Sequence, residues 1–126
     1  MENFYNFNEE KQFFNIRSTA KKLAHTIGFD SNSSVDISTI FSELTRNFSA
    51  IGKNLDITME VIQLGKNVGI EFSITAFTNN TIRTKFSVNG HLGSGLENIK
   101  RRVDNFCISS SGGEIKVITQ KWIPAA

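Results

Sequence analysis

The sequence predicts a two-layer α/β sandwich in which helices cover one face of a mixed or antiparallel sheet. Three segments carry apolar residues at helical spacing, and the segments between them alternate apolar with polar residues. The predicted order is helix, helix, hairpin, helix, hairpin, which is typical of two packed layers. Each predicted strand has one polar face, so we expect helices on one side only. The 126 residues are enough for one domain with a core, spanning residues 1–126.

The N-terminal part predicts a short edge strand at residues 3–7, followed by a helix. Apolar residues recur at helical spacing from Asn8 or Glu9 as far as Ile27, and Gly28 is placed to end the helix.

A second helix is predicted over about 34–51, with candidates for its N-cap at Ser31 to Ser34. Gly52 can take the left-handed position that ends it. Its apolar residues fall within an arc of roughly 100°, and they are Ile37, Ile40, Phe41, Leu44, Phe48 and Ile51. Arg46 is expected to point to solvent, while Glu43 and Asn47 lie side by side on one flank of the arc.

Two hairpins and a third helix complete the predicted fold. Alternation predicts strands on either side of a Gly65-Lys66-Asn67 turn, with inward residues Leu55, Ile57, Met59, Val61, Ile70, Phe72, Ile74 and Ala76. Residues 78–94 look irregular. The stripe of the third helix is Leu96, Ile99, Val103 and Phe106. The last hairpin is expected to run from Cys107 to Ser109, turn at Gly112-Gly113, and return from Glu114 to Trp122.

Composition excludes several classes of protein. A net charge of +2 is too small to indicate a nucleic-acid binder, and no segment reaches the roughly 18 apolar residues of a membrane span. The N-terminus lacks the pattern of a signal peptide, which predicts a cytoplasmic protein. The single cysteine, Cys107, lies in an apolar run between Phe106 and Ile108 and is predicted to be a buried structural thiol.

The first motif of chemical interest is the pair Glu43 and Asn47, one helical turn apart. An amide oxygen can ligate Mg²⁺, and a neighbouring carboxylate can orient or deprotonate a hydroxyl group. Spacing alone favours the alternative of two solvated residues beside a core helix.

The second motif is a glycine-rich loop, with Gly90, Gly93 and Gly95 just before the third helix. Glycines let backbone N–H groups approach a phosphate, and a helix N-terminus favours an anion, although such loops also serve as plain turns. Without a Gly-Lys-Ser or Gly-Lys-Thr sequence, the P-loop interpretation fails. The basic run Lys100 to Arg102 is a solvated face by default, and one of its residues is a candidate for a phosphate contact.

Taken in order, these motifs resemble those of the GHKL (histidine-kinase-like) ATPase and kinase superfamily. The resemblance is to the RsbT-type switch serine kinases and anti-sigma-factor kinases of bacterial partner-switching systems, and it covers roughly residues 5–123. The matching segments are the N box at residues 43–47, the stretch from Gly93 to Phe106, and Lys121-Trp122. This resemblance implies a Bergerat-like fold that uses ATP and Mg²⁺, with Asn47 holding the metal and Glu43 as catalytic carboxylate. It also implies phosphate contacts from the segment 90–95 and Lys100.

One departure from the family concerns the adenine site. The family carries Asp-x-Gly-x-Gly after the second hairpin strand, whereas this chain has Thr78 or Asn79 at the place of the Asp, and neither glycine. Loss of a charge-assisted hydrogen bond costs about 1.5–3 kcal/mol, or roughly tenfold to hundredfold in affinity. We therefore expect ATP binding to be weak or absent.

Two functions compete on this basis. The first, favoured by the altered adenine stretch, is a stress-response or sigma-factor regulator that binds a protein partner without chemistry. The alternative is an active ATP-dependent serine kinase or anti-sigma factor, favoured by retention of Glu43, Asn47, Gly93 and Gly95. The expected partners are an antagonist, a sigma factor or a phosphatase, met around residues 78–102. A homodimer stays an open alternative, and nucleic acid and membrane are not expected.

Overall fold

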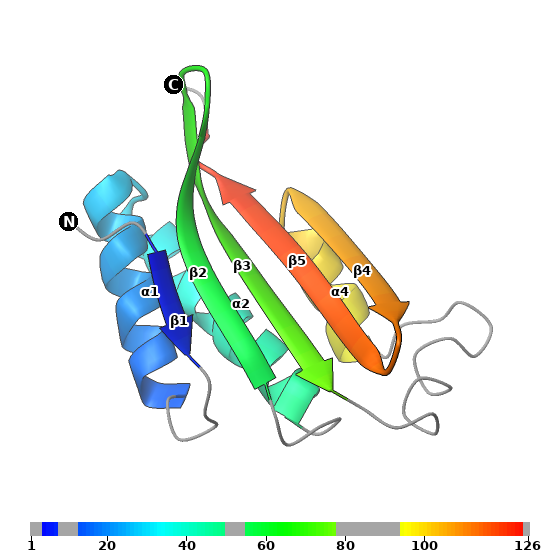
Figure 1. Cartoon of the computed structure of the whole chain (residues 1–126). Helices are drawn as coiled ribbons and strands as arrows, with labels where there is room; N and C mark the ends of the chain where they lie inside the picture. Colours follow the sequence, from blue (N-terminus) through cyan, green and yellow to red (C-terminus); the bar gives the residue numbers. More distant parts are fainter. Residues whose placement is uncertain (1–3, 8–12, 50–54, 78–93, 125–126) are drawn as a thin grey trace.

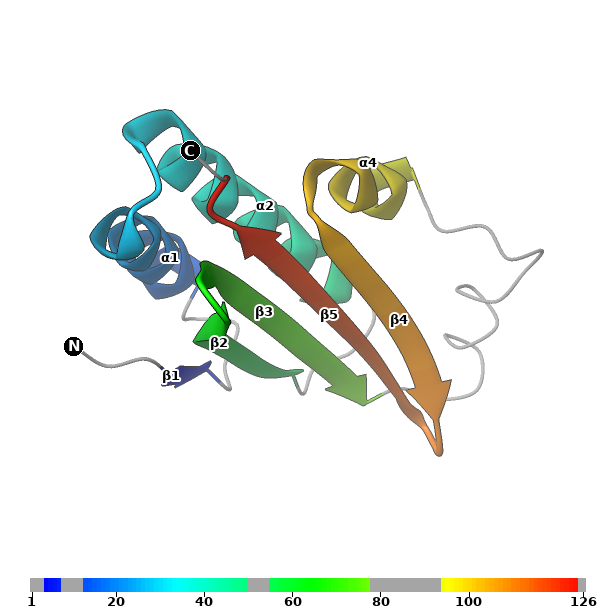
Figure 2. The same cartoon turned by 90° about the horizontal axis from the view of Figure 1, so that it is seen from above.

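The structure is a computed structural model that describes residues 4–7, 13–49, 55–77 and 94–124. Within these ranges five strands form one sheet in the order β1-β2-β3-β5-β4, and all four pairings are antiparallel. The three helices of the described ranges lie on one face of this sheet (Figures 1 and 2). The predicted combination of helices with an antiparallel sheet is therefore confirmed.

The N-terminal elements follow the prediction closely. Strand β1, Phe4–Phe7, pairs with β2 at one edge of the sheet. Helix α1, Phe13–Ile27, buries Ile16, Ala20, Leu23 and Ala24. Its predicted beginning at Asn8 or Glu9 lies outside the described residues. Gly28 follows α1 with a φ of 123°, a left-handed conformation that glycine adopts readily, so it ends the helix as predicted.

Helix α2, Ser31–Ser49, begins three residues earlier than predicted because its cap is Asp30. The Oδ1 atom of Asp30 accepts a hydrogen bond from the backbone N–H of Ser33 at 2.7 Å, and its carbonyl accepts one from Ser34. The predicted caps at Ser31 to Ser34 are therefore wrong, since an aspartate just upstream satisfies the free N–H groups. The bond from Ser33 also lowers the pKa of Asp30, because it favours the charged carboxylate.

The apolar face of α2 is buried as predicted, through Ile37, Ile40, Phe41, Leu44 and Phe48. The ring of Phe41 stacks on that of Phe72 in β3, with centroids 4.3 Å apart and planes 7° from parallel. This stacking holds α2 against the middle of the sheet. It also sets the position of the flank that carries Glu43 and Asn47. Predicted residues Ile51 and Gly52 lie outside the described ranges.

Strands β2, Leu55–Leu64, and β3, Asn67–Phe77, form the longest hairpin. Their inward residues are those that the alternation predicted, and all are buried except Val61, which packs partly against the core. The turn is shorter than predicted, because Asn67 already pairs with Leu64. It consists of Gly65 and Lys66 alone, and Gly65 has a φ of 62°.

The C-terminal elements are α4, Ser94–Arg102, β4, Asn105–Ser111, and β5, Glu114–Trp122. Strands β3 and β4 run in the same direction with β5 between them, and α4 belongs to the connection (Figure 1). The predicted helical stripe is corrected at its end: α4 stops at Arg102, and Phe106 lies in β4. Val103 and Asp104 connect the helix to the strand, and the N–H of Asp104 donates to the carbonyl of Gln120, the residue with which Asn105 forms the first strand pair.

The prediction for Cys107 is wrong, because this thiol is exposed. Its neighbours Phe106 and Ile108 pack partly against the core. Successive side chains of a strand point to opposite faces, so Cys107 faces the side of the sheet opposite to the helices. An apolar run in an edge strand therefore does not bury all of its members.

The described residues satisfy their buried polar groups. No buried side-chain nitrogen or oxygen among them lacks a hydrogen-bond partner. For example, Thr119 of β5 donates to the carbonyl of Phe72 across the sheet. Within the same ranges, none of the helices has the length and apolar character needed to cross a bilayer.

Candidate functional site

The flank of α2 presents Glu43 and Asn47 together, as the sequence predicts. Both side chains are half-buried. The amide nitrogen of Asn47 donates to the carbonyl of Glu43 at 2.8 Å, a bond within the helix that fixes the orientation of the amide. The side chain of Asn47 is therefore held by its own helix.

Asn47 lies directly against the first turn of α4. A Cβ atom built on Gly95 would lie 3.1 Å from the Oδ1 atom of Asn47 and 3.3 Å from its Nδ2 atom. A glycine at this position therefore lets α4 approach α2 closely. Two of the predicted site residues, 48 positions apart in the numbering, are thus brought into contact.

Glu43 has a partner that the sequence did not predict. The Nη1 atom of Arg102, at the end of α4, lies 3.2 Å from the Oε2 atom of Glu43. The Nη2 atom of the same guanidinium pairs with Asp36, two turns earlier on α2. Arg102 therefore bridges two carboxylates of α2 and ties α4 to it.

The ion pairs determine what Glu43 can do chemically. The pKa of Arg102 is raised, chiefly by its hydrogen bond to Asp36 and also by the negative charges of Asp36 and Glu43. The guanidinium is therefore a permanent cation beside the Glu43 carboxylate. The adjacent positive charge opposes a divalent cation at the oxygens of this carboxylate.

Two described residues that the resemblance assigns to a magnesium–nucleotide site are already engaged in other contacts. Glu43 already has a cation, and the oxygen of Asn47 faces Gly95. No group of three His, Cys, Asp or Glu side chains within the described ranges could hold a metal ion. Lys100 is exposed on α4. The remaining predicted site residues, Thr78, Asn79, Gly90 and Gly93, lie outside the described residues.

The Lys-Trp pair at the end of β5 has a structural role. The Nζ atom of Lys121 donates to the carbonyl of Arg102 at 3.1 Å, which caps the last turn of α4. The N–H of Trp122 donates to Asp104, and its indole nitrogen donates to Asn105. These bonds attach the connection between α4 and β4 to the neighbouring strand.

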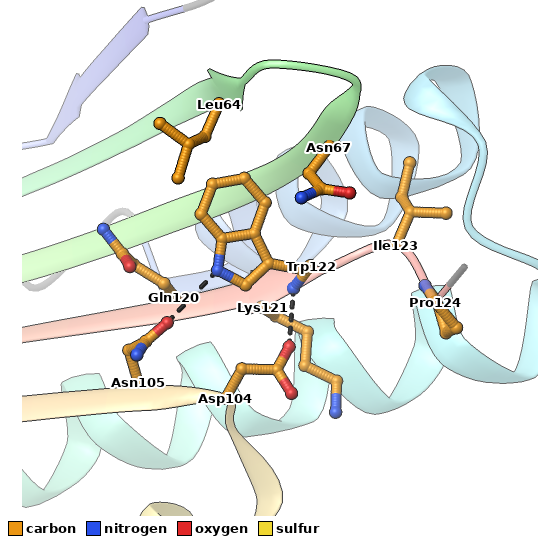
Figure 3. A pocket seen from close by; sticks show the side chains of 9 residues that line it. All are labelled: Leu64, Asn67, Asp104, Asn105, Gln120, Lys121, Trp122, Ile123 and Pro124. Atoms are coloured by element: carbon orange, nitrogen blue, oxygen red, sulfur yellow. Dashed lines mark hydrogen bonds between the residues drawn. The ribbon is translucent and has the colours of Figure 1, made fainter.

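The same residues border a shallow hollow of about 650 Å³ at the end of the sheet (Figure 3). The indole of Trp122 lies over Gly69 of β3, where a Cβ atom would come within 2.9 Å of the ring. The hollow also includes Leu64, Asn67 and Gln120. A second hollow, of about 370 Å³, lies between α1 and α2 beside Arg17 and Lys21. Neither is lined by Glu43, Asn47 or Gly95.

Sequence reasoning missed Arg102 and Asp36 as parts of the site. Spacing did not single out Arg102, because Arg102 follows the buried Ile99 by three positions while Lys100 follows the buried Leu96 by four. In the structure Lys100 and Arg101 are exposed, whereas Arg102 is half-buried. Nothing in the sequence indicated which carboxylates α4 would meet.

Comparison with known proteins adds no family to this picture. The chain matched neither any protein-family model nor, at a significant level, any curated protein sequence. The resemblance to the kinase superfamily therefore depends on the motifs alone.

Proposed function

We propose that this protein is a non-catalytic regulator with a GHKL-like domain, which acts by binding a protein partner of a bacterial partner-switching system. Binding of the partner does not require ATP. The motifs carry the resemblance to that family, and the altered adenine stretch at residues 78–79 argues against tight binding of nucleotide.

The observation that carries the proposal is the pairing of Glu43 with Arg102. In the resembling kinases this glutamate would be the catalytic carboxylate, and it would need to accept a proton or orient a hydroxyl group. Here it lies 3.2 Å from a guanidinium that also pairs with Asp36. The negative charge of Glu43, which a kinase reaction would need, instead forms an ion pair that joins α2 to α4.

Isothermal titration calorimetry with Mg-ATP tests the loss of nucleotide chemistry. We expect dissociation in the high micromolar range or weaker, both for the natural chain and for Asn47→Ala. Tight binding that requires Mg²⁺ and is abolished by Asn47→Ala would contradict the proposal.

The contact between Asn47 and Gly95 favours a second candidate, an active serine kinase with a modified adenine site. A kinase of this family would need the same two segments side by side. The test is phosphoryl transfer to a purified antagonist protein, measured with radiolabelled ATP. Transfer that is lost in Glu43→Ala would establish this second candidate and overturn the first.

The proposed partner surface includes the exposed face of α4, where Lys100 and Arg101 lie. An acidic partner would be attracted to these charges, and its association would slow as salt is added. We expect the double variant Lys100→Gln/Arg101→Gln to bind a purified sigma factor or antagonist more slowly, with and without ATP. Lys21→Gln/Lys22→Gln removes the same charge from exposed positions of α1 and is the matched control.

A further inference from the structure

Strand β4 forms an edge of the sheet within the described residues, and its own sequence gives that edge little protection. It is seven residues long, and its sequence from Asn105 to Ser111 contains no charged residue and no proline. Its register with β5 is continuous, with one partner for every residue, so it contains no β-bulge. Within the described part of the chain, β4 is paired on one side only.

Such an edge is uncommon in a protein that remains monomeric. Natural sheets protect their edges with charged side chains, proline, bulges or very short strands, because free N–H and C=O groups accept another strand. The opposite edge, β1, is only four residues long. Strand β4 has none of these protective features.

The side chains of β4 also leave apolar surface uncovered. Phe106 and Ile108 face the helix layer, and both are only partly buried. On the other face of the sheet, Cys107, Ser109 and Ser111 are small and exposed. A strand added beside β4 would cover Phe106 and Ile108 without burying a charge.

We propose that β4 pairs in antiparallel fashion with β4 of a second copy of this chain, about a two-fold axis at Ile108. The two five-stranded sheets then become one continuous sheet. In this register Ile108 faces Ile108 of the second copy, and Cys107 faces Ser109 of the second copy. Each chain presents the same strand to the other, as a closed dimer requires.

The sequence of β4 fits a second copy because it complements itself. An antiparallel pairing about a two-fold axis at Ile108 sets Cys107 against Ser109, Phe106 against Ser110 and Asn105 against Ser111 of the second copy, so each of these side chains meets a small serine. A charge would face another charge only where both symmetric positions carried one. None is present, and the residue on the axis is a half-buried isoleucine. The inference is independent of the proposed function, since it involves neither Glu43 nor nucleotide.

Sedimentation of charged variants tests the pairing and its register. The natural chain is expected to shift from monomer to dimer as concentration rises. Cys107→Lys/Ser109→Lys sets lysine opposite lysine at both symmetric positions and should weaken the dimer by about tenfold or more. Cys107→Lys/Ser109→Glu sets lysine opposite glutamate and should restore dimerisation. The control Asn15→Lys/Gln63→Lys adds two lysines at exposed positions outside β4 and should dimerise as the natural chain does.

Cross-linking through the single cysteine gives a second, direct measurement. In the proposed register the two Cys107 residues are diagonal neighbours, about 8 Å apart. A short bismaleimide should therefore produce a covalent dimer of the natural chain, and none of Cys107→Ser. Circular dichroism of each variant verifies that it is folded.

Three outcomes would overturn the inference. The natural chain could stay monomeric at all concentrations, or the two-lysine variant could dimerise as strongly as the natural chain. The variant Cys107→Lys/Ser109→Glu could also fail to dimerise, which would exclude this register. The chain could also stay monomeric and bind an extended peptide of a different protein along β4. This result would show that the edge serves another partner, and it would contradict the proposed dimer.

Discussion

At the scale of single residues, Arg102 is the most consequential side chain of the site. Its side chain is 29% exposed, and the side chains of its partners Asp36 and Glu43 are 46% and 36% exposed. Solvent at these exposures screens the ion pairs, so their loss should cost about 1 kcal/mol. We expect Arg102→Gln to lower the free energy of unfolding in urea by about this amount.

Arg101→Gln is the matched control, because it removes the same charge from the neighbouring, exposed position of α4. It should leave the free energy of unfolding nearly unchanged. Equal effects of the two substitutions would show that the bridge between α2 and α4 does not stabilise the fold.

The N-cap of α2 gives a prediction that depends on pH. Hydrogen bonds from Ser33 hold the pKa of Asp30 below its ordinary value of 3.8, so the charged form stabilises the folded state. This contribution is complete above that value and is lost as the pH falls through the lower pKa of the folded protein. Asp30→Asn keeps a capping side chain but removes the titration.

We therefore expect the natural chain to lose stability relative to Asp30→Asn as the pH is lowered from 5 towards 2. Thermal unfolding at a series of pH values measures this difference. Asp30→Ala, which has no capping oxygen, should be less stable than both at pH 7. A difference between the natural chain and Asp30→Asn that does not change with pH would contradict the prediction.

At the scale of elements, the contact between β3 and β5 depends on Gly69. A Cβ atom at this position would lie 2.6 Å from the carbonyl oxygen of Lys121 and 2.9 Å from the indole of Trp122. Because one of these atoms is backbone, Gly69→Ala would force the two strands apart. We expect it to lower the free energy of unfolding by about 1–3 kcal/mol, measured in urea.

The variant Gly69→Ala/Trp122→Phe separates the two clashes. A smaller ring relieves the contact with the indole but not that with the Lys121 carbonyl. Adding Trp122→Phe to Gly69→Ala should therefore recover only part of the loss. Full recovery would show that the strand pairing itself tolerates the added methyl group.

Elements with a strong period were predicted well, but some of their ends were not. The stripe of α2 determined both its helical form and its buried face, because one periodic pattern extends over most of its length. The end of α4 was mistaken because Val103 and Phe106 continue its helical spacing, although neither residue belongs to the helix. The helix ends there because Asp104 and Asn105 pair with Gln120 and because Lys121 donates to the carbonyl of Arg102, and these partners are distant in the sequence.

The candidate site was predicted only in part, for a similar reason. Glu43 and Asn47 share one helix, so their spacing places them together. The pairing of Glu43 with Arg102 joins two helices, and no local pattern specifies how α4 is rotated against α2. Local periodicity therefore predicted that Glu43 and Asn47 lie together. The ion pair between Glu43 and Arg102 depends on tertiary packing and could not be predicted from that periodicity.

At the scale of the whole molecule, the protection of backbone amides against hydrogen exchange should decrease from the centre of the sheet to its edges. Strand β3 pairs with β2 on one side and β5 on the other, whereas β1 and β4 each pair on one side. Native-state hydrogen exchange should therefore be slowest in β3 and fastest in β1. Exchange in β4 as slow as in β3 in dilute monomer would contradict this order.

The packing of Trp122 gives the protein a built-in optical probe. It is the only tryptophan in the chain, it is half-buried against Gly69, and its indole nitrogen is bonded to Asn105 at the start of β4. Its fluorescence therefore originates from one place, the junction of β3, β5 and β4. Separation of β4 from β5 would expose the indole to water and shift its emission to longer wavelength. Emission spectra can thus follow the state of this end of the sheet without any added label.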